Sequence, residues 1–135
     1  MSKGTVLVIE DNRDILDAMR LLLEQDEFTV ITAENCSTGI DDLAFYQPDV
    51  ILTDLMLPEM TGLEFIRLVR RVANYDHIPI VAISAYDKTY LIAAIAAGAE
   101  CALHKPEDLD SLVKTINQVL ERRYKGKARE AELGI

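Results

Sequence analysis

The sequence predicts an α/β fold in which a parallel five-stranded sheet carries helices on both faces. Short apolar runs alternate strictly with segments whose apolar residues recur at helical spacing. Each apolar run also ends abruptly on polar residues. Strands that are joined through helices run parallel, and parallel sheets are buried on both faces. The 135 residues suffice for one domain of this kind.

The first half of the chain supplies two strands and two helices. Residues 6–9 form a continuous apolar run, and residues 15–23 then place apolar side chains at helical spacing. Residues 28–33 are rich in β-branched side chains and alternate in polarity, as an edge strand does. The spacing around 40–44 predicts the second helix.

The second half continues the same alternation. Residues 50–53 and 78–83 are short apolar runs of the buried type, and a helix is expected between them at 63–73. A fourth helix is expected at 89–97, ended by Gly98, because glycine suits the left-handed position after a helix.

The last predicted elements are a short strand at 101–103 and an amphipathic helix at 109–120, capped by Asp108. The five strands fit a flavodoxin-like sheet of order 2-1-3-4-5, with five helices on its two faces. We assign residues 1–123 to this domain. Residues 124–135 are charged and weakly patterned, which predicts a helix extension, or a linker if the natural protein is longer.

The composition narrows the function and the location. A net charge of −9 argues against direct binding to nucleic acid or to an anionic membrane. Cys36 and Cys101 fit neither a zinc site nor a redox pair, so we interpret both as free thiols. The amino terminus leads straight into the first strand without a signal peptide, and no apolar stretch is long enough to span a bilayer. We therefore expect a cytoplasmic protein.

Polar side chains stand where the predicted strands end. Glu10 and Asp11 follow the first strand, Asp54 the third, Ser84 the fourth and Lys105 the fifth. In doubly wound sheets the functional crevice lies beyond these ends. Three carboxylates that meet there repel one another, and a hard divalent cation such as Mg²⁺ relieves the repulsion through oxygen ligands. The site therefore predicts a bound magnesium ion.

An aspartate beside a metal ion, a hydroxyl and a lysine suits nucleophilic attack on phosphorus. Simpler interpretations exist for each residue alone. Asp11 could cap the first helix, Glu10 could be a solvated charge at a strand end, Ser84 a turn hydroxyl and Lys105 a surface lysine. Their joint order along the chain favours the phosphoryl site.

Four segments carry a resemblance to a known family. They are VLVIEDN at 6–12, PDVILTDLMLPEMTGLEF at 48–65, IPIVAISA at 78–85 and AGAECALHKP at 97–106. Together they resemble the receiver domain of two-component response regulators, in the stand-alone form of chemotaxis regulators, over residues 4–122. The resemblance implies a phosphorylation-dependent switch, not an enzyme, that takes its phosphoryl group from a histidine kinase or a phosphotransfer protein.

The resemblance also implies roles for single residues. Asp54 is the phosphoacceptor, and Ser84 and Lys105 contact the phosphoryl group. Asp11 and Asp54 bind Mg²⁺ directly, Glu10 assists through water, and the backbone carbonyl of Met56 completes the protein ligands. The family further implies a cis peptide bond between Lys105 and Pro106.

The sequence departs from the family at one position of the switch. Ala102 stands where relatives usually carry Tyr or Phe, so the aromatic side chain that would rotate inward with the serine is missing. Tyr86 and His104 are candidates to replace it, although residue statistics favour an ordinary packed Tyr86 and a solvated His104. Neither Met56 nor Tyr86 can act as a base on an attacking water at neutral pH, which predicts slow loss of the phosphoryl group.

The helix at 89–97 is too apolar for all its residues to face the sheet. It is either a closely packed helix of small residues or an interaction surface. In the family, the face formed with the strand at 101–103 and the helix at 109–120 commonly carries output, which implies a downstream protein or a homodimer there.

Three other functions share parts of this pattern. An FMN or nucleotide binder needs phosphate-binding loops, whereas the first loop here is acidic and no Walker or GxGxxG pattern is present. An aspartate-dependent phosphohydrolase would use the same residues but usually needs a cap over its substrate. A receiver that no longer takes phosphate is the third alternative, and Ala102 is compatible with it. The cognate kinase and the downstream target stay open.

Overall fold

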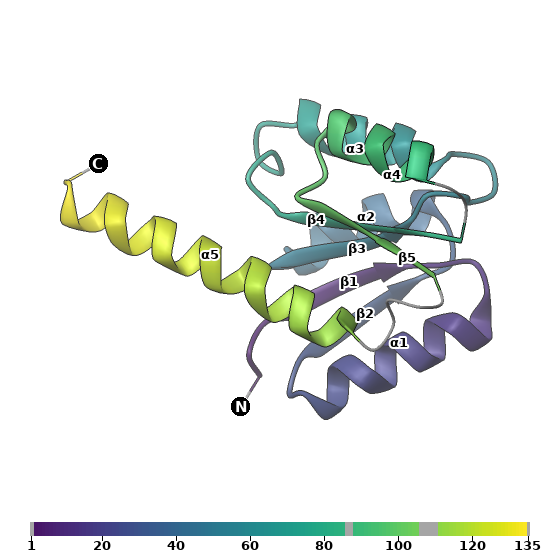
Figure 1. The fold of residues 1–135 in the computed structure, drawn as a ribbon, viewed down its shortest axis with the longest axis horizontal. Helices are drawn as coiled ribbons and strands as arrows, with labels where there is room; N and C mark the ends of the chain where they lie inside the picture. Colours follow the sequence, from purple (N-terminus) through teal and green to yellow (C-terminus); the bar gives the residue numbers. More distant parts are fainter. Residues whose placement is uncertain (1, 86–87, 106–110, 135) are drawn as a thin grey trace.

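The computed structural model describes residues 2–85, 88–105 and 111–134, without the side chains of residues 127, 128, 130 and 131. It contains one sheet of five parallel strands in the order β2-β1-β3-β4-β5, which confirms the predicted fold class (Figure 1). The strands are β1 (Thr5–Ile9), β2 (Thr29–Ala33), β3 (Val50–Asp54), β4 (Ile80–Ser84) and β5 (Cys101–His104). The helices are α1 (Arg13–Gln25), α2 (Cys36–Tyr46), α3 (Gly62–Arg71), α4 (Lys88–Ala97) and α5 (Leu112–Glu132).

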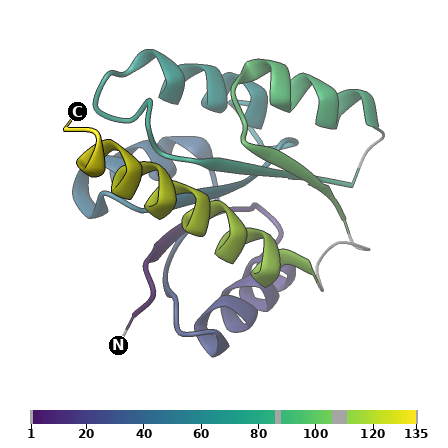
Figure 2. The same ribbon diagram turned by 60° about the vertical axis from the view of Figure 1, so that its left-hand side comes forward.

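The sheet separates two hydrophobic layers. One layer packs α2, α3 and α4 on one face through residues such as Leu43, Phe65 and Ala94. The other packs α1 and α5 on the opposite face through residues such as Met19 and Ile116. Figure 2 shows the same division of the helices after rotation. The central strands β1, β3 and β4 are almost wholly buried, because both of their faces are covered.

Side-chain caps fix where the helices begin. Asn12, Asn35 and Thr61 each accept a hydrogen bond from the backbone amide three residues later, at the starts of α1, α2 and α3. The cap of α1 is therefore Asn12 and not Asp11, so the simpler interpretation of Asp11 as a cap is wrong. The expected cap Asp108 and the Lys105–Pro106 peptide bond lie outside the described residues.

Strand β4 begins at Ile80, two residues later than its apolar run predicts. Ile78 is buried, but its amide donates to the carbonyl of Tyr75 at 3.1 Å, so it closes a turn before the strand starts. An apolar run marks burial, and burial here extends beyond the strand.

Helix α5 continues well past the sheet and projects from the body (Figure 1). It leaves the body at Arg123, whose Nη1 donates to the carbonyl oxygen of Asp49 at 2.8 Å. Residues 124–132 thus continue α5 as a helix. Among the described residues, no helix combines the length and the apolar character that a membrane span requires.

Arg70 ties together three segments on the α3 and α4 side. Its Nε donates to the carbonyl of Gly98 at 2.9 Å, and its Nη1 donates to the carbonyls of Asp76 at 3.0 Å and Ile78 at 2.7 Å. Gly98 has φ of +124°, and a side chain there would meet the Cγ of Arg70 at 2.7 Å. The glycine that ends α4 is therefore required both by its backbone and by its neighbour.

Candidate functional site

Three carboxylates gather beyond the carboxyl ends of β1 and β3. Glu10 and Asp11 follow β1, and Asp54 is the last residue of β3. One carboxylate oxygen from each lies within 4.8 Å of the others. Glu10 and Asp54 are buried, whereas Asp11 is exposed and keeps the cluster open to solvent. The parallel pairing of β1 with β3 brings the ends of these strands to the same edge of the sheet.

Lys105 lies against the two buried carboxylates. Its ammonium Nζ donates to Asp54 Oδ2 at 2.8 Å and makes a second, short contact with Glu10 Oε1. Lys105 follows β5 and is itself buried, and its amide donates to the carbonyl of Ser84 at 2.8 Å. The site thus holds three acidic groups, Glu10, Asp11 and Asp54, and a single ammonium group, that of Lys105. The acids outnumber the cation.

The environment separates the proton affinities of the two buried acids. Burial, helped by a hydrogen bond to Asp54, raises the pKa of Glu10 to about 8. Burial also acts to raise the pKa of Asp54, but hydrogen bonds with Glu10 and Lys105 outweigh it and hold that pKa below its usual value. Burial opposes the charge of Lys105, but its two hydrogen bonds to the carboxylates raise its pKa above the usual value. Asp54 is therefore the ionised member of the pair, as a nucleophile must be.

The backbone around Asp54 holds its side chain in place. The amide of Met56 donates to Asp54 Oδ1 at 3.0 Å, so both oxygens of this carboxylate have a partner. The amide of Gly62 donates to the carbonyl of Leu55 at 3.0 Å. This hydrogen bond holds the start of α3 close to the backbone that follows β3. A Cβ at Gly62 would lie 2.2 Å from the carbonyl oxygen of Asp54, so only glycine fits.

The remaining predicted residues lie around this centre. Ser84 is buried at the end of β4 and stands beside His104 in the register of β4 with β5. Met56 is 38% exposed beside Asp54. Ala102 pairs with Ala82 and packs partly buried against the α2, α3 and α4 layer, and no aromatic ring occupies this position of β5. Tyr86 lies outside the described residues.

The residues present suit a hard divalent cation. All three side chains offer carboxylate oxygens, which are the ligands that Mg²⁺ prefers. The exposed Asp11 leaves room for the water molecules that this ion keeps. Burial, above all, raises the pKa of Glu10 to about 8, so positive charge brought to the cluster would favour its carboxylate form. An acidic cluster of this composition could bind Mg²⁺.

Sequence reasoning missed two features of the site. The first is the direct pairing of Lys105 with Glu10, which depends on side-chain directions that strand order alone does not give. The second is the close contact of Gly62 with the backbone of Asp54. The only signal for the contact is the glycine that opens α3 directly after its cap Thr61.

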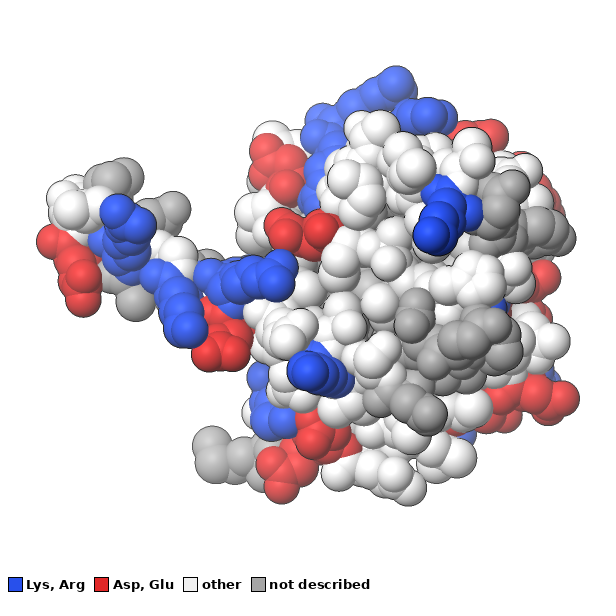
Figure 3. All heavy atoms as spheres, in the orientation of Figure 1, with Lys and Arg blue, Asp and Glu red and all other residues white. Residues whose placement is uncertain are grey.

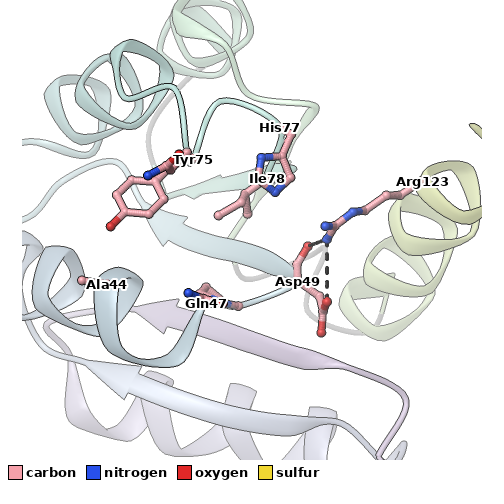
Figure 4. A pocket seen from close by; sticks show the side chains of 9 residues that line it. Ala44, Gln47, Asp49, Tyr75, His77, Ile78 and Arg123 are labelled. Atoms are coloured by element: carbon pink, nitrogen blue, oxygen red, sulfur yellow. Dashed lines mark hydrogen bonds and ion pairs between the residues drawn. The ribbon is translucent and has the colours of Figure 1, made fainter. Parts of the chain in front are cut away.

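A cavity of about 550 Å³ lies at the opposite edge of the sheet, before β3 and β4 begin. In Figure 4 Arg123 reaches across its rim to Asp49, and Gln47, Tyr75 and His77 surround it. None of the predicted site residues lines this cavity. The acidic cluster is thus a separate and more compact site.

Comparisons with known proteins agree with this geometry. The family described as response regulator receiver domain matches residues 6–117. The phosphate regulon transcriptional regulatory protein PhoB of Klebsiella pneumoniae is 34% identical over 118 residues, which are 87% of this chain and 52% of that protein. The KDP operon transcriptional regulatory protein KdpE of Escherichia coli K12 is 36% identical over 118 residues, 87% of this chain and 51% of that protein. The chain spans about half the length of these relatives.

Solved structures of response regulators have the same fold as this chain. The chemotaxis response regulator CheY4 of Vibrio cholerae superposes with a TM-score of 0.80 at 28% identity, covering 86% of this chain and 98% of that one. A response regulator receiver domain protein from Clostridium thermocellum gives a TM-score of 0.82 at 27% identity, covering 90% of this chain and 97% of that one. The chain belongs to the response regulator receiver domain family of two-component signalling.

Proposed function

We propose that Asp54 accepts a phosphoryl group from a histidine kinase or a phosphotransfer protein, and that this change is the signal the protein passes on. The observation that carries the proposal is the position of Asp54, which accepts a hydrogen bond from Lys105 and has a carboxylate oxygen within 4.8 Å of oxygens from two further acids. Receiver domains are regulatory signalling domains rather than enzymes. We place the transfer in the cytoplasm.

The reaction needs little beyond positioning and charge. An oxygen of Asp54 attacks phosphorus and forms a new P–O bond, while the bond between phosphorus and the donor breaks and its electron pair leaves with the donor. Lys105 keeps positive charge beside the transferred group, and Ser84 offers it a hydroxyl. The amide of Met56 already holds one Asp54 oxygen, which fixes the orientation of the carboxylate.

Mg²⁺ completes this site in the proposal. Asp11 and Asp54 would bind the ion directly, Glu10 would assist through water, and the carbonyl of Met56 would add a fourth protein contact. When bound, the ion supplies the positive charge that the phosphoryl oxygens require. The positive charge of the ion would favour the carboxylate form of Glu10, whose pKa burial otherwise raises to about 8.

The test is labelling by a small phosphodonor such as acetyl phosphate. Wild-type protein is expected to take up one phosphoryl group in the presence of Mg²⁺ and none after chelation. Asp54→Asn keeps the shape of the side chain but removes the nucleophilic oxygen, so its uptake should fall to background. Uptake by Asp54→Asn equal to that of wild type would refute the assignment. Turnover of a generic phosphate ester that Asp54→Asn abolishes would instead favour a phosphohydrolase.

We expect the phosphoryl group to remain for minutes or longer. Hydrolysis needs a base that activates water beside Asp54, and the exposed neighbour Met56 offers only a weakly accepting thioether. Release of inorganic phosphate after removal of the donor measures the decay. Complete loss within a few seconds would contradict this expectation.

We propose that output leaves through the face formed by α4, β5 and α5. On α4 only Ala94 is buried, while Ile92 is 69% and Ile95 is 48% exposed. All four residues of β5 are half-buried, so the strand is incompletely covered. Exposed apolar side chains on α4 beside an incompletely covered β5 favour a protein partner, either a downstream protein or a second copy.

Ile92→Glu should abolish phosphorylation-dependent association through this face, because it places a charge in the centre of the apolar surface. Sedimentation of phosphorylated and unphosphorylated protein measures the effect. Phosphoryl uptake by Ile92→Glu should equal that of wild type, which separates the output surface from the acceptor site. Identical sedimentation of both proteins in both states would argue against this face.

A further inference from the structure

The carboxyl-terminal part of α5 carries a basic stripe. Residues 122–129 hold five of the 14 Lys and Arg residues and no Asp or Glu, although the net charge of the chain is −9. Arg122, Lys125 and Arg129 recur at intervals of three and four, so they share one face of the helix, and all three are exposed. Figure 3 shows the basic side chains along the projecting helix.

This face has little to bind within its own chain. Lys125 makes only an exposed ion pair with Glu121 at 3.1 Å. Within the part of the chain that the structure describes, neither Arg122 nor Arg129 forms an ion pair. Gly126 lies between them on the same face, and a Cβ added there would meet nothing within 4 Å. A glycine inside a helix costs about 0.5–1 kcal/mol relative to alanine, and among the described residues no packing contact explains Gly126.

A groove elsewhere on the surface has the complementary character. It lies between α2 and the start of α3 and has a volume of about 310 Å³. Ile40, Pro58 and Met60 give it an apolar floor, and Glu59 and Glu64 line its rim. Both glutamates are exposed, and no ion pair of either one is found among the described residues.

We propose that this groove receives the basic face of α5 from a second copy of the chain. The aliphatic stems of Arg and Lys can cover an apolar floor while their charged groups reach an acidic rim. Gly126 lets the backbone of the incoming helix approach the floor closely. A second copy of the chain carries both the basic face of α5 and the acidic groove, so each copy can bind the other. This contact uses the carboxyl-terminal part of α5 and the groove between α2 and α3, not the exposed residues of α4 and β5 proposed for output, and it does not depend on phosphorylation.

Sedimentation velocity of the unphosphorylated full chain tests the contact. Wild type should associate with rising concentration at low salt, and the association should weaken at least about tenfold when high salt screens the charges. Arg122→Glu/Arg129→Glu and Glu59→Lys/Glu64→Lys should each sediment as monomers. An equimolar mixture of the two variants should associate again. The acidic helix of the first variant then meets the basic groove of the second, and the basic helix of the second meets the acidic groove of the first.

Two controls keep the result specific. Arg13→Glu/Arg20→Glu makes the same change of charge on α1 and should associate like wild type. Ile92→Glu should also associate like wild type, which separates this contact from the output face. A monomeric wild type at low salt would overturn the proposal, and so would failure of the mixture to associate. Loss of association only in the helix variant would show that the stripe binds a different anionic surface, which also overturns it.

Discussion

Gly62→Ala is expected to lower the free energy of unfolding by at least about 2 kcal/mol, the cost of forcing extra volume into a packed site. The added Cβ would lie 2.2 Å from the carbonyl oxygen of Asp54 and 2.6 Å from the Cα of Leu55. Both contacts are with backbone, which cannot move aside as a flexible side chain can. Relief requires α3 to shift away from the end of β3, so the Asp54 carboxylate should lose its orientation.

Chemical denaturation measures the stability, and phosphoryl uptake from a small donor reports the geometry of the site. Gly126→Ala is the matched control, because it makes the same change in a helix where nothing lies within 4 Å of the added atom. The control should be more stable than wild type by about 0.5–1 kcal/mol, since alanine suits a helix better than glycine. Equal stability of Gly62→Ala and wild type would contradict the close contact.

Lys105→Met is expected to reduce phosphoryl uptake by about a hundredfold, the usual cost of removing a charged group from a transition state. The same change should lower stability in the absence of Mg²⁺ by about 3 kcal/mol, because it leaves two buried carboxylates without their cation. The loss stays near the low end of the range for buried pairs. Glu10, whose pKa is already about 8, can hold a proton instead.

Mg²⁺ should restore much of the stability of Lys105→Met. The variant has lost the cation that lies between Glu10 and Asp54, so about 10 mM Mg²⁺ should raise its melting temperature more than that of wild type through preferential binding to the folded state. Lys125→Met removes a lysine whose ion pair is exposed, and it should change stability by less than about 1 kcal/mol. An unchanged response to Mg²⁺ in Lys105→Met would contradict the proposed position of the metal.

Both the fold and the position of the site, beyond the carboxyl ends of the strands, could be predicted from the sequence. Both follow from the parallel direction of the strands. In a parallel sheet every strand points the same way, so acids that follow two apolar runs meet if the runs are neighbours. Glu10, Asp11 and Asp54 meet that condition, and the structure brings them together. Burial patterns are periodic properties of the chain, so strand and helix types and helix faces follow from them, whereas the strand order comes from the few arrangements that such sheets adopt.

The remaining features depend on three-dimensional contacts between residues distant in the chain. The contact of Lys105 with Glu10 joins residues 95 positions apart. The three carbonyls that Arg70 binds belong to a loop and to the end of α4, and nothing in the sequence around Arg70 indicates them. The choice of Asn12 over Asp11 as a helix cap was also not decided by residue type, because both residues are good caps.

The contacts of Arg70 restrict how α4 can respond to the site. They attach the carboxyl end of α4, at Gly98, to the chain just before β4. The amino end of α4 follows Ser84 by a few residues and has no such attachment to Arg70. Arg70 therefore couples the carboxyl end of α4 to the turn that precedes β4, so these two segments hold each other in position.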